Sequence, residues 1–239
     1  MHNTPLSYEN LTAYIHNPSG KDKAGSMAII MDQTLDSLVT SLPIIHPRIQ
    51  SILLKLKHNI TIHNTYHQRS NKLCLSQISA IPPTLHSIIA GDLNSLDNPS
   101  LDYCSSADIH AHNFQPIRTL LSGGFTDSFC LANPDDIKFT RWGKANHSGG
   151  THVVATRIDH ILVTPNLAKM ISSSTILEDK EADSDHRVCI TAFNLTSPSV
   201  IPLKPINVRK GLKDPDMWSF FTKSIPNVVC SGNIDDDAV

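Results

Sequence analysis

The chain lacks a surplus of basic residues. Among its 239 residues, Lys and Arg number 20 and Asp and Glu number 22, which gives a formal net charge of −2. General attraction to nucleic acid comes from an excess of Lys and Arg, so none is expected here. Any contact with nucleic acid must therefore be local.

The chain also lacks a cysteine framework. Its five cysteines are odd in number, widely spaced and never arranged as C-x-x-C. Disulfide scaffolds and zinc sites need paired or closely spaced cysteines, so the pattern favours neither. We expect free thiols in a reducing compartment.

Long apolar runs are absent as well. No stretch approaches the roughly 18 apolar residues of a membrane-spanning helix. The segment from Met1 to Tyr14 is polar and has no basic region followed by an apolar one, as a secretory leader would. We expect an intracellular protein that is neither secreted nor bound to a membrane, and a nuclear location is compatible with this pattern.

The composition that is present suits a globular protein. Hydrophobic residues make up 40% of the chain and charged residues 18%, which allows a buried core. At this length we expect one domain over residues 1–195, followed by a tail over residues 196–239. The tail begins with a proline-containing linker and continues with Pro215 to Lys223, an aromatic-rich segment expected to form a short helix. Such a segment suits docking or the start of a following domain.

Short strands alternate with short helices along the domain. The first clear strand is expected at Met27 to Met31. Further strands are expected at 49–56, 60–66, 87–90, 137–142, 157–163 and 187–193, and helices at 71–78, 114–121 and 165–171. Residues 143–150 read as a loop. This alternation predicts an α/β layered domain.

Polar side chains stand at the ends of three of these strands. They are Asp92 with Asn94, Asp159, and Asp185 with His186. Strand ends in α/β sheets present side chains to a shared cleft, where a carboxylate can bind Mg²⁺ or activate water. The alternatives are that Gly-Asp-x-Asn is an ordinary turn and that Asp159 pairs with Arg157 or a surface cation.

The sequence Ser184-Asp185-His186 is the most informative of these clusters. It places a carboxylate that could bind a metal beside an imidazole that could act as a general acid or base. An imidazole in that role needs a second carboxylate to fix its tautomer, and Asp159 is the candidate. We therefore expect a His186–Asp159 pair.

Several blocks occur in a fixed order along the chain. They are Ile88-Ile89-Ala90-Gly91-Asp92-Leu93-Asn94, Phe125-Thr126-Asp127-Ser128-Phe129, Phe139-Thr140-Arg141-Trp142, Arg157-Ile158-Asp159-His160-Ile161-Leu162-Val163 and Ser184-Asp185-His186-Arg187. Together they resemble the endonuclease/exonuclease/phosphatase family over roughly Tyr14 to Leu195. The R-I-D-x-I-L-V and S-D-H-R forms are most similar to apurinic endonucleases and to the endonuclease domains of LINE-type (non-LTR) retrotransposons. The resemblance implies a four-layered α/β sandwich of two packed mixed sheets flanked by helices.

The resemblance also implies catalytic roles. Asp92 would orient or deprotonate the attacking water, and Asn94 would donate a hydrogen bond to the scissile phosphate. His186, held by Asp159, would be the acid/base or phosphate-stabilising imidazole. Tyr66, in a strand that resembles the family's N-x-Y strand, would donate its hydroxyl to a phosphate oxygen.

A metal is implied with these roles. Asp185 and Asp92 would ligate or support Mg²⁺, for which Mn²⁺ could substitute, and the metal would neutralise charge at the phosphorus. The implied reaction is a DNA nick with a 3′ hydroxyl and a 5′ phosphate. The aromatic segment around Trp218 is similar to the stretch that joins such a domain to a reverse transcriptase, so that domain is an implied partner.

Two blocks of the family pattern are not found before Tyr14. These are a first strand with an Asn near its end and a second strand ending in Q-E-T, whose Glu is a principal metal ligand. Glu9 lies in a polar stretch with no strand expected before it, so it is not assigned that role. The resemblance thus implies a domain incomplete at its start. An inactive relic of the fold, or a phosphatase or phosphodiesterase of the same fold, remains an alternative.

Three further residues are candidates for DNA contact. Arg141 and Arg157 could pair with phosphate, and the Trp142 indole could stack or wedge at a base step. The alternative is that Trp142 packs in the core and that Arg157 bridges Asp127 or Asp159.

Overall fold

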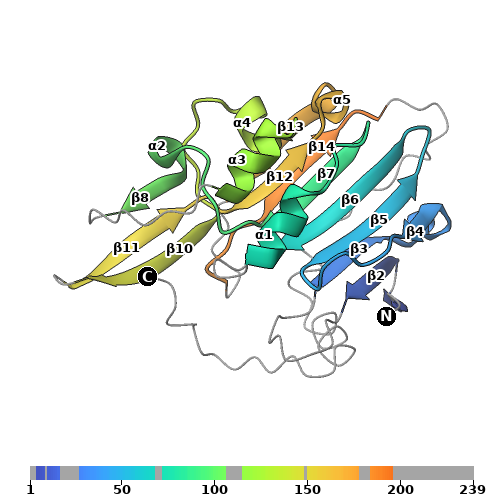
Figure 1. Cartoon of the computed structure of the whole chain (residues 1–239), viewed down its shortest axis with the longest axis horizontal. Coiled ribbons are helices and arrows are strands. Elements are labelled where there is room, and N and C mark those ends of the chain that lie inside the picture. Colours follow the sequence, from blue (N-terminus) through green and yellow to red (C-terminus); the bar gives the residue numbers. More distant parts are fainter. Residues whose placement is uncertain are drawn as a thin grey trace. The chain divides into compact units, whose positions relative to one another are not determined.

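The computed structural model describes residues 4–8, 10–16, 27–67, 72–105, 115–147, 150–177 and 184–195 (Figure 1). The expected linker and aromatic helix in residues 196–239 lie outside the described residues. The described chain divides into two compact units at Asn64 and Thr65, and the second unit extends to Asn194. Each unit is considered by itself.

The first unit is built from antiparallel strands. One sheet has the order β1-β2-β3, and β4, β5 and β6 are neighbours in that order in another. The bounds are β1 Thr4–Tyr8, β2 Leu11–His16, β3 Met27–Asp32, a 3-10 helix Gln33–Leu38, β4 Val39–Ser41, β5 Ile49–Lys55 and β6 Asn59–Tyr66. The core of this unit contains Tyr14, Met31 and Ile52.

Two strands precede Met27, where the first clear strand was expected, and the expectation that no strand precedes Glu9 is wrong. Strands β1 and β2 form a hairpin, and β2 pairs with β3 along its whole length. Polar residues hide β2 in the sequence, because Thr12 is fully buried and its hydroxyl donates to an Asp36 carboxylate oxygen at 2.6 Å. The partner that makes a buried threonine acceptable lies 24 residues away, so local patterning does not reveal it.

The second unit contains the strands that end at the candidate site. Strand β12 (Asp159–Val163) lies between β7 (Ser87–Asp92) and β9 (Thr126–Asp127) and is antiparallel to both. Ile89 and Leu162 are direct partners in this pairing and both are fully buried. Burial of these apolar side chains fixes the register, because a one-residue slip would turn each of them to the other face.

The other strands described in this unit form two smaller sheets. One has the order β10-β11-β8 and the other pairs β13 with β14. The bounds are β8 Tyr103–Ser105, β10 Arg141–His147, β11 Gly150–Thr156, β13 Ile171–Ile176 and β14 Cys189–Phe193. The strand expected at 137–142 therefore begins later, and most of the expected loop at 143–150 is strand. Backbone pairing between β10 and β11 stabilises this ribbon, and backbone pairing leaves little hydrophobic pattern to read.

Helices pack on these strands. Helix α1 contacts α3, and α4 packs on β12 and β13 (Figure 1). The bounds are α1 Lys72–Ser79, α2 Pro99–Asp102, α3 Gln115–Ser122, α4 Ser128–Ala132 and α5 Pro165–Ala168. The expected α/β class is confirmed. None of the helices in the described ranges is long and apolar enough to cross a membrane.

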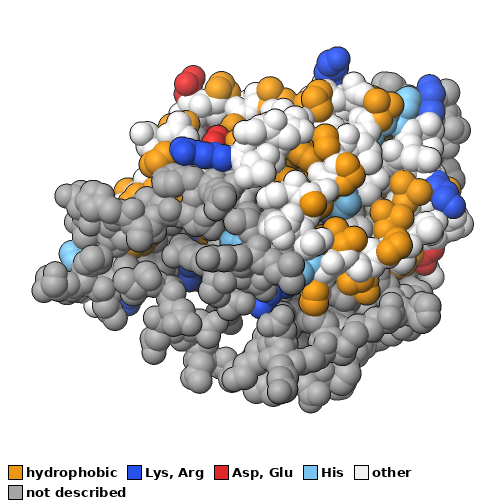
Figure 2. All heavy atoms as spheres, viewed as in Figure 1, with side chains coloured by type: hydrophobic (Ala, Val, Ile, Leu, Met, Phe, Trp, Pro, Cys, Tyr) orange, Lys and Arg blue, Asp and Glu red, His pale blue; other side chains and the backbone are white. Residues whose placement is uncertain are grey.

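Charged side chains are scattered on the face seen in Figure 2. Among the residues described there, Lys, Arg, Asp and Glu stand apart rather than in one large patch of a single sign. This distribution agrees with the near-zero net charge of the chain.

Candidate active site

Three of the sequence-predicted residues meet at one point of the second unit. Asp92 ends β7, Asp159 begins β12, and the two are direct partners in the antiparallel pairing. His186 joins them through a bridge between its backbone and that of Arg141. One potential ligand atom from each of Asp92, Asp159 and His186 lies within 4.8 Å of the others. We call these three residues the acidic cluster.

The His186 ring is oriented by Asp159. Its Nδ1 lies 2.9 Å from Oδ2 of Asp159. Because a carboxylate only accepts, Nδ1 carries the proton and donates a hydrogen bond to Asp159. Burial opposes the charged imidazolium, but the hydrogen bond and the charges of Asp159, Asp92 and Asp185 raise the pKa of His186 above its ordinary value. The Nε2 atom is left to act on a substrate.

Asp92 is affected by its surroundings in a similar way. Burial, followed by the like charge of Asp159, raises the pKa of Asp92 to about 6. The backbone N–H of Asn94 and the charges of His186 and Arg141 oppose this rise. A carboxylate with a pKa near neutrality can accept a proton from water at physiological pH.

Asn94 shapes the turn after β7. It adopts a positive φ of 43°, its backbone N–H donates to Oδ1 of Asp92 at 2.8 Å, and its side-chain amide donates to the His67 carbonyl at 2.9 Å. The same amide lies 3.2 Å from Oδ2 of Asp92. Asn94 therefore orients Asp92, and its contact with a phosphate stays a prediction.

Tyr66 is the last residue of β6 and is 38% exposed. The next residue, His67, donates its backbone N–H to the Asp92 carbonyl at 2.8 Å. Tyr66 therefore lies beside the end of β7, and its contact with a phosphate stays a prediction.

Asp185 lies at the edge of the cluster. Its Oδ2 accepts from Nε of Arg141 at 2.9 Å, its Oδ1 is 3.9 Å from Nε2 of His186, and its side chain is half exposed. The group whose ligand atoms lie together contains Asp159 and not Asp185. The Asp185 carboxylate pairs with the Arg141 guanidinium, and its contact with a metal stays a prediction.

Trp142 lies beside Arg187, the residue that follows His186. The Arg187 guanidinium is 4.8 Å from the centre of the indole ring, and Phe139 meets the same ring edge-on at 6.1 Å. Trp142 is only partly buried, so it can still reach a ligand. Its contact with DNA, like that of Arg141, stays a prediction.

Arg157 does not face solvent, which corrects its interpretation as a DNA contact. It is 3% exposed and pairs with Asp102 at 2.6 Å and with Asp127 at 2.9 Å. The alternative of a bridge to Asp127 therefore holds, with Asp102 as a second partner. A buried guanidinium keeps its charge only when carboxylates compensate it, which ties Arg157 to the interior.

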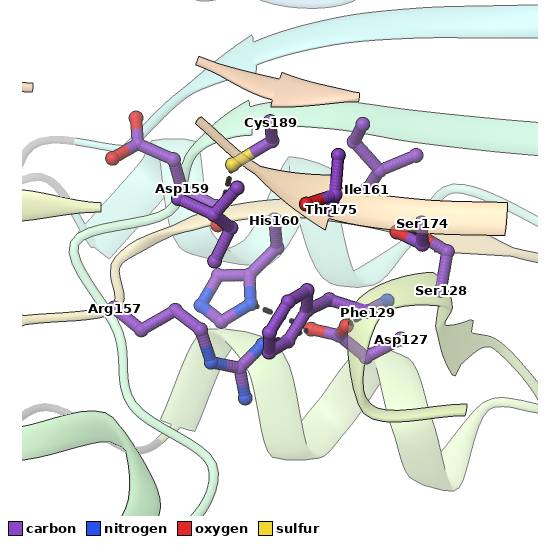
Figure 3. Close-up of a pocket in the computed structure, with 11 residues that line it drawn as sticks. Asp127, Ser128, Phe129, Arg157, Asp159, His160, Ile161, Ser174, Thr175 and Cys189 are labelled. Carbon is purple, nitrogen blue, oxygen red and sulfur yellow. Dashed lines mark hydrogen bonds and ion pairs between the residues drawn. The ribbon is translucent and has the colours of Figure 1, made fainter. Parts of the chain in front are cut away.

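A buried polar network surrounds Arg157, and Figure 3 shows Arg157, His160 and Asp127 pointing toward one another. Nδ1 of His160 lies 2.8 Å from Oδ2 of Asp127, and Nε2 lies 2.9 Å from the Ser95 carbonyl oxygen. Burial alone would raise the pKa of Asp127, but His160 and Arg157 hold it well below its usual range. The side chain of Asp159 points away from this network, because neighbouring residues of a strand face opposite sides.

Sequence reasoning assigned no role to His160 or Asp102, and it named Asp127 only as an alternative partner of Arg157. One signal is present, since His160 is a polar residue in the middle of an apolar strand. The network fixes the start of β12, and Asp127 also caps α4 by accepting from the N–H groups of Phe129 and Cys130. These residues support the site and do not face it.

The acidic cluster fits a divalent cation. Two carboxylates and an imidazole converge, and carboxylate oxygens are the ligands that Mg²⁺ and Mn²⁺ prefer. Burial and, second to it, the like charge of Asp159 raise the pKa of Asp92, and a bound cation would favour the charged carboxylate. The cluster can also activate water through Asp92 and transfer a proton through His186.

Comparisons with protein-family models and with curated proteins give no match. Solved structures do match. The endonuclease domain of TRAS1, a telomere-specific non-LTR retrotransposon, has a TM-score of 0.58 at 19% identity, over 80% of this chain and 83% of that chain. An AP endonuclease from Archaeoglobus fulgidus has a TM-score of 0.54 at 15% identity, over 78% of this chain and 80% of that one.

A third match is a 3′-5′ exonuclease from Neisseria meningitidis, with a TM-score of 0.55 at 20% identity over 77% of this chain and 80% of that chain. These likenesses agree with the fold expected from the ordered sequence blocks. The chain therefore has the fold of the endonuclease/exonuclease/phosphatase proteins.

Proposed function

We propose that the protein is a metal-dependent phosphodiester hydrolase that nicks DNA. One observation carries the proposal: Asp92, Asp159 and His186 offer ligand atoms within 4.8 Å of one another, in a fold whose solved examples include nucleases. A water-activating carboxylate beside an oriented imidazole is what in-line attack on a phosphodiester requires.

The residues in and around the acidic cluster have separate roles in the reaction. Asp92 orients and deprotonates the attacking water, and Asn94 keeps the Asp92 carboxylate in place. His186 presents Nε2 to the phosphate because its Nδ1 is bonded to Asp159. The raised pKa of His186 favours the imidazolium, whose Nε2–H stabilises the charge that develops on the phosphate oxygens or protonates the leaving oxygen.

Asp92 and Asp159 would hold the cation, with Asp185 at the edge of the site. When bound, Mg²⁺ or Mn²⁺ would neutralise negative charge on the phosphate. The Arg141–Asp185 ion pair next to the cluster leaves Asp185 less suited to a direct metal bond than Asp159.

The similar solved structures favour DNA as the substrate. One is a retrotransposon endonuclease domain and another is a 3′ phosphatase from Neisseria bound to a product DNA hairpin. In this chain Arg141, Trp142 and Arg187 lie beside the cluster and would contact the strand. A role in retrotransposition would place the protein in the nucleus with a reverse transcriptase as its partner.

The proposal is tested by nicking of supercoiled plasmid with the full chain in Mg²⁺ or Mn²⁺ and in EDTA. His186→Gln and Asp92→Asn should each lower the nicking rate by about 10²- to 10⁴-fold. His58→Gln, which changes an exposed histidine in the loop between β5 and β6, should nick at the wild-type rate.

The ends of the product identify the reaction. A 3′ hydroxyl that a polymerase extends, with a 5′ phosphate, would support the endonuclease. Release of inorganic phosphate from 3′-phosphorylated DNA without nicking would instead identify a phosphatase of the same fold. A folded chain with neither activity would show that it is an inactive relic and would refute the proposal.

A further inference from the structure

We propose that Thr140 is a positioning residue for the His186–Asp159 pair, which it holds through the backbone of Asp159 and that of Arg187, next to His186. Thr140 is fully buried, and its side chain meets the acidic cluster only through the backbone N–H of Asp159. The inference rests on the proposed function, and it deepens that proposal by naming the residue that sets the geometry of the pair.

The Thr140 hydroxyl organises the backbone at the start of β12. Its oxygen accepts from the N–H of Ile158 at 3.0 Å and from the N–H of Asp159 at 3.1 Å. The hydroxyl proton points toward the Thr156 carbonyl oxygen at 3.5 Å, which also accepts from the Thr140 N–H at 2.9 Å. One side-chain oxygen thus serves as the acceptor for both amides.

The Thr140 carbonyl holds the other partner. It accepts from the N–H of Arg187 at 2.6 Å, one residue beyond His186. On the far side of His186, the Asp185 carbonyl accepts from the N–H of Trp142 at 2.9 Å. The short segment Thr140 to Trp142 therefore fixes the backbone on both sides of His186.

These contacts link the two halves of the pair. Asp159 and His186 are 27 residues apart in the sequence, and their side chains meet in a single 2.9 Å hydrogen bond. A hydrogen bond weakens steeply once distance or angle departs from its optimum, so a small shift of either backbone would break it. Thr140 contacts the backbone of Asp159 and that of Arg187, the residue next to His186, and so keeps the two segments in register.

The alternative is that Thr140 serves only as a β-branched residue that fills space. Valine would then replace it without consequence for the pair, because the two side chains have nearly the same shape. The hydroxyl argues against that alternative, because it is the acceptor for two amides and the Ile158 residue is buried. Buried amides without an acceptor shift to find one.

The test reads the His186 ring directly, without metal and without DNA. Full-length protein with ¹⁵N-labelled histidine is compared by NMR at a pH above the end of the His186 titration, which the same spectra follow. The wild type should show the proton on Nδ1, donated to Asp159. Thr140→Val should show a mixture with the proton on Nε2, and Thr140→Ser should restore the wild-type spectrum.

Thr164→Val is the matched control. Thr164 is also buried, and its hydroxyl accepts from the Ser87 N–H at 3.0 Å and donates to the Leu85 carbonyl at 3.2 Å. This variant loses an equivalent hydroxyl elsewhere, so it should leave the His186 tautomer unchanged even if it unfolds more easily. A wild-type His186 spectrum in folded Thr140→Val would overturn the inference.

Two further measurements keep the inference testable. If Thr140→Val does not fold, Thr140→Cys provides a weak sulfur acceptor, and it should show more of the Nε2 tautomer than Thr140→Ser. Equal spectra for those two variants would contradict the inference. If the wild type nicks DNA, Thr140→Val should lower kcat by about 10-fold or more with little change in KM.

The outcomes separate this inference from the proposed function. A tautomer change without any nicking in the wild type supports the role of Thr140 and refutes the endonuclease. Nicking by the wild type at a rate that Thr140→Val does not change supports the endonuclease and refutes the role of Thr140.

Discussion

Asp92 and Asp159 are direct partners across the antiparallel strands β7 and β12. Like charges placed opposite each other on neighbouring strands are destabilising. Here burial and this repulsion raise the pKa of Asp92 to about 6, while His186 and Arg141 offset part of the effect. Carboxylates that are crowded in this way are characteristic of sites that bind a cation or move a proton.

The hydrogen bond from His186 to Asp159 predicts the effect of Asp159→Asn. The asparagine side chain has nearly the same shape, but it removes the charge that favours the protonated ring and allows the wrong tautomer. We expect the single-turnover nicking rate to fall by about 10²- to 10⁴-fold.

Asp185→Asn is the comparison for that variant. Because Asp185 is half exposed and pairs with Arg141, its loss should cost less activity than the loss of Asp159. An equal or larger loss for Asp185→Asn would restore Asp185 as the main metal ligand.

Arg157 lies between two buried carboxylates, so Arg157→Met should destabilise the protein. The variant leaves Asp102 and Asp127 without their cation, and breaking a buried pair in this way costs about 3–5 kcal/mol. Urea unfolding followed by circular dichroism measures the loss. Arg141→Met, which breaks a more exposed pair, should cost about 1 kcal/mol or less, and similar costs for both variants would contradict the prediction.

Gly91 has no room for a side chain. A Cβ at this position would lie 1.9 Å from the Thr65 carbonyl oxygen, and the φ of Gly91 is +139°. Gly91→Ala should therefore destabilise the protein by about 3 kcal/mol or more and displace the adjacent Asp92. The control is Gly143→Ala, because a Cβ at Gly143 meets no atom within 4 Å, and this variant should unfold at the wild-type urea concentration.

His63 makes stability depend on pH. Burial lowers its pKa from 6.5 to about 4, so the native ring stays neutral where the unfolded chain takes up a proton. The unfolding free energy is therefore unaffected by His63 above pH 6.5 and decreases as the pH falls from 6.5 toward 4. Below pH 4 the total decrease due to His63 is about 3 kcal/mol.

His63→Gln should remove that part of the pH dependence. The glutamine amide can still bond the Ser51 hydroxyl, which lies 2.8 Å from Nδ1 of His63 in the wild type. The measurement is the difference in unfolding free energy between wild type and variant across this range. A constant difference between the two proteins would show that His63 titrates normally in the native state.

Much of the site follows from sequence order. Asp92, Asp159 and His186 each stand at the end of a strand or beside one, and the ordered blocks around them are enough to predict the α/β fold. Hydrophobic runs such as Ser87–Asp92 and Asp159–Val163 also place the central strands within a few residues. Local patterning succeeds there because the side chains that form the pattern are the ones that become buried.

The tertiary structure decided what depends on partners distant in the sequence. Three features rest on contacts with other segments: the pairing of strands β1 and β2, the burial of Arg157, and the meeting of Asp159 with His186. The proposed role of Thr140 rests on such contacts as well. The identity of a polar residue does not reveal whether its side chain faces water or a buried partner. The sequence by itself therefore determined which chemical groups are available, and only the packing of distant segments decided which of them meet.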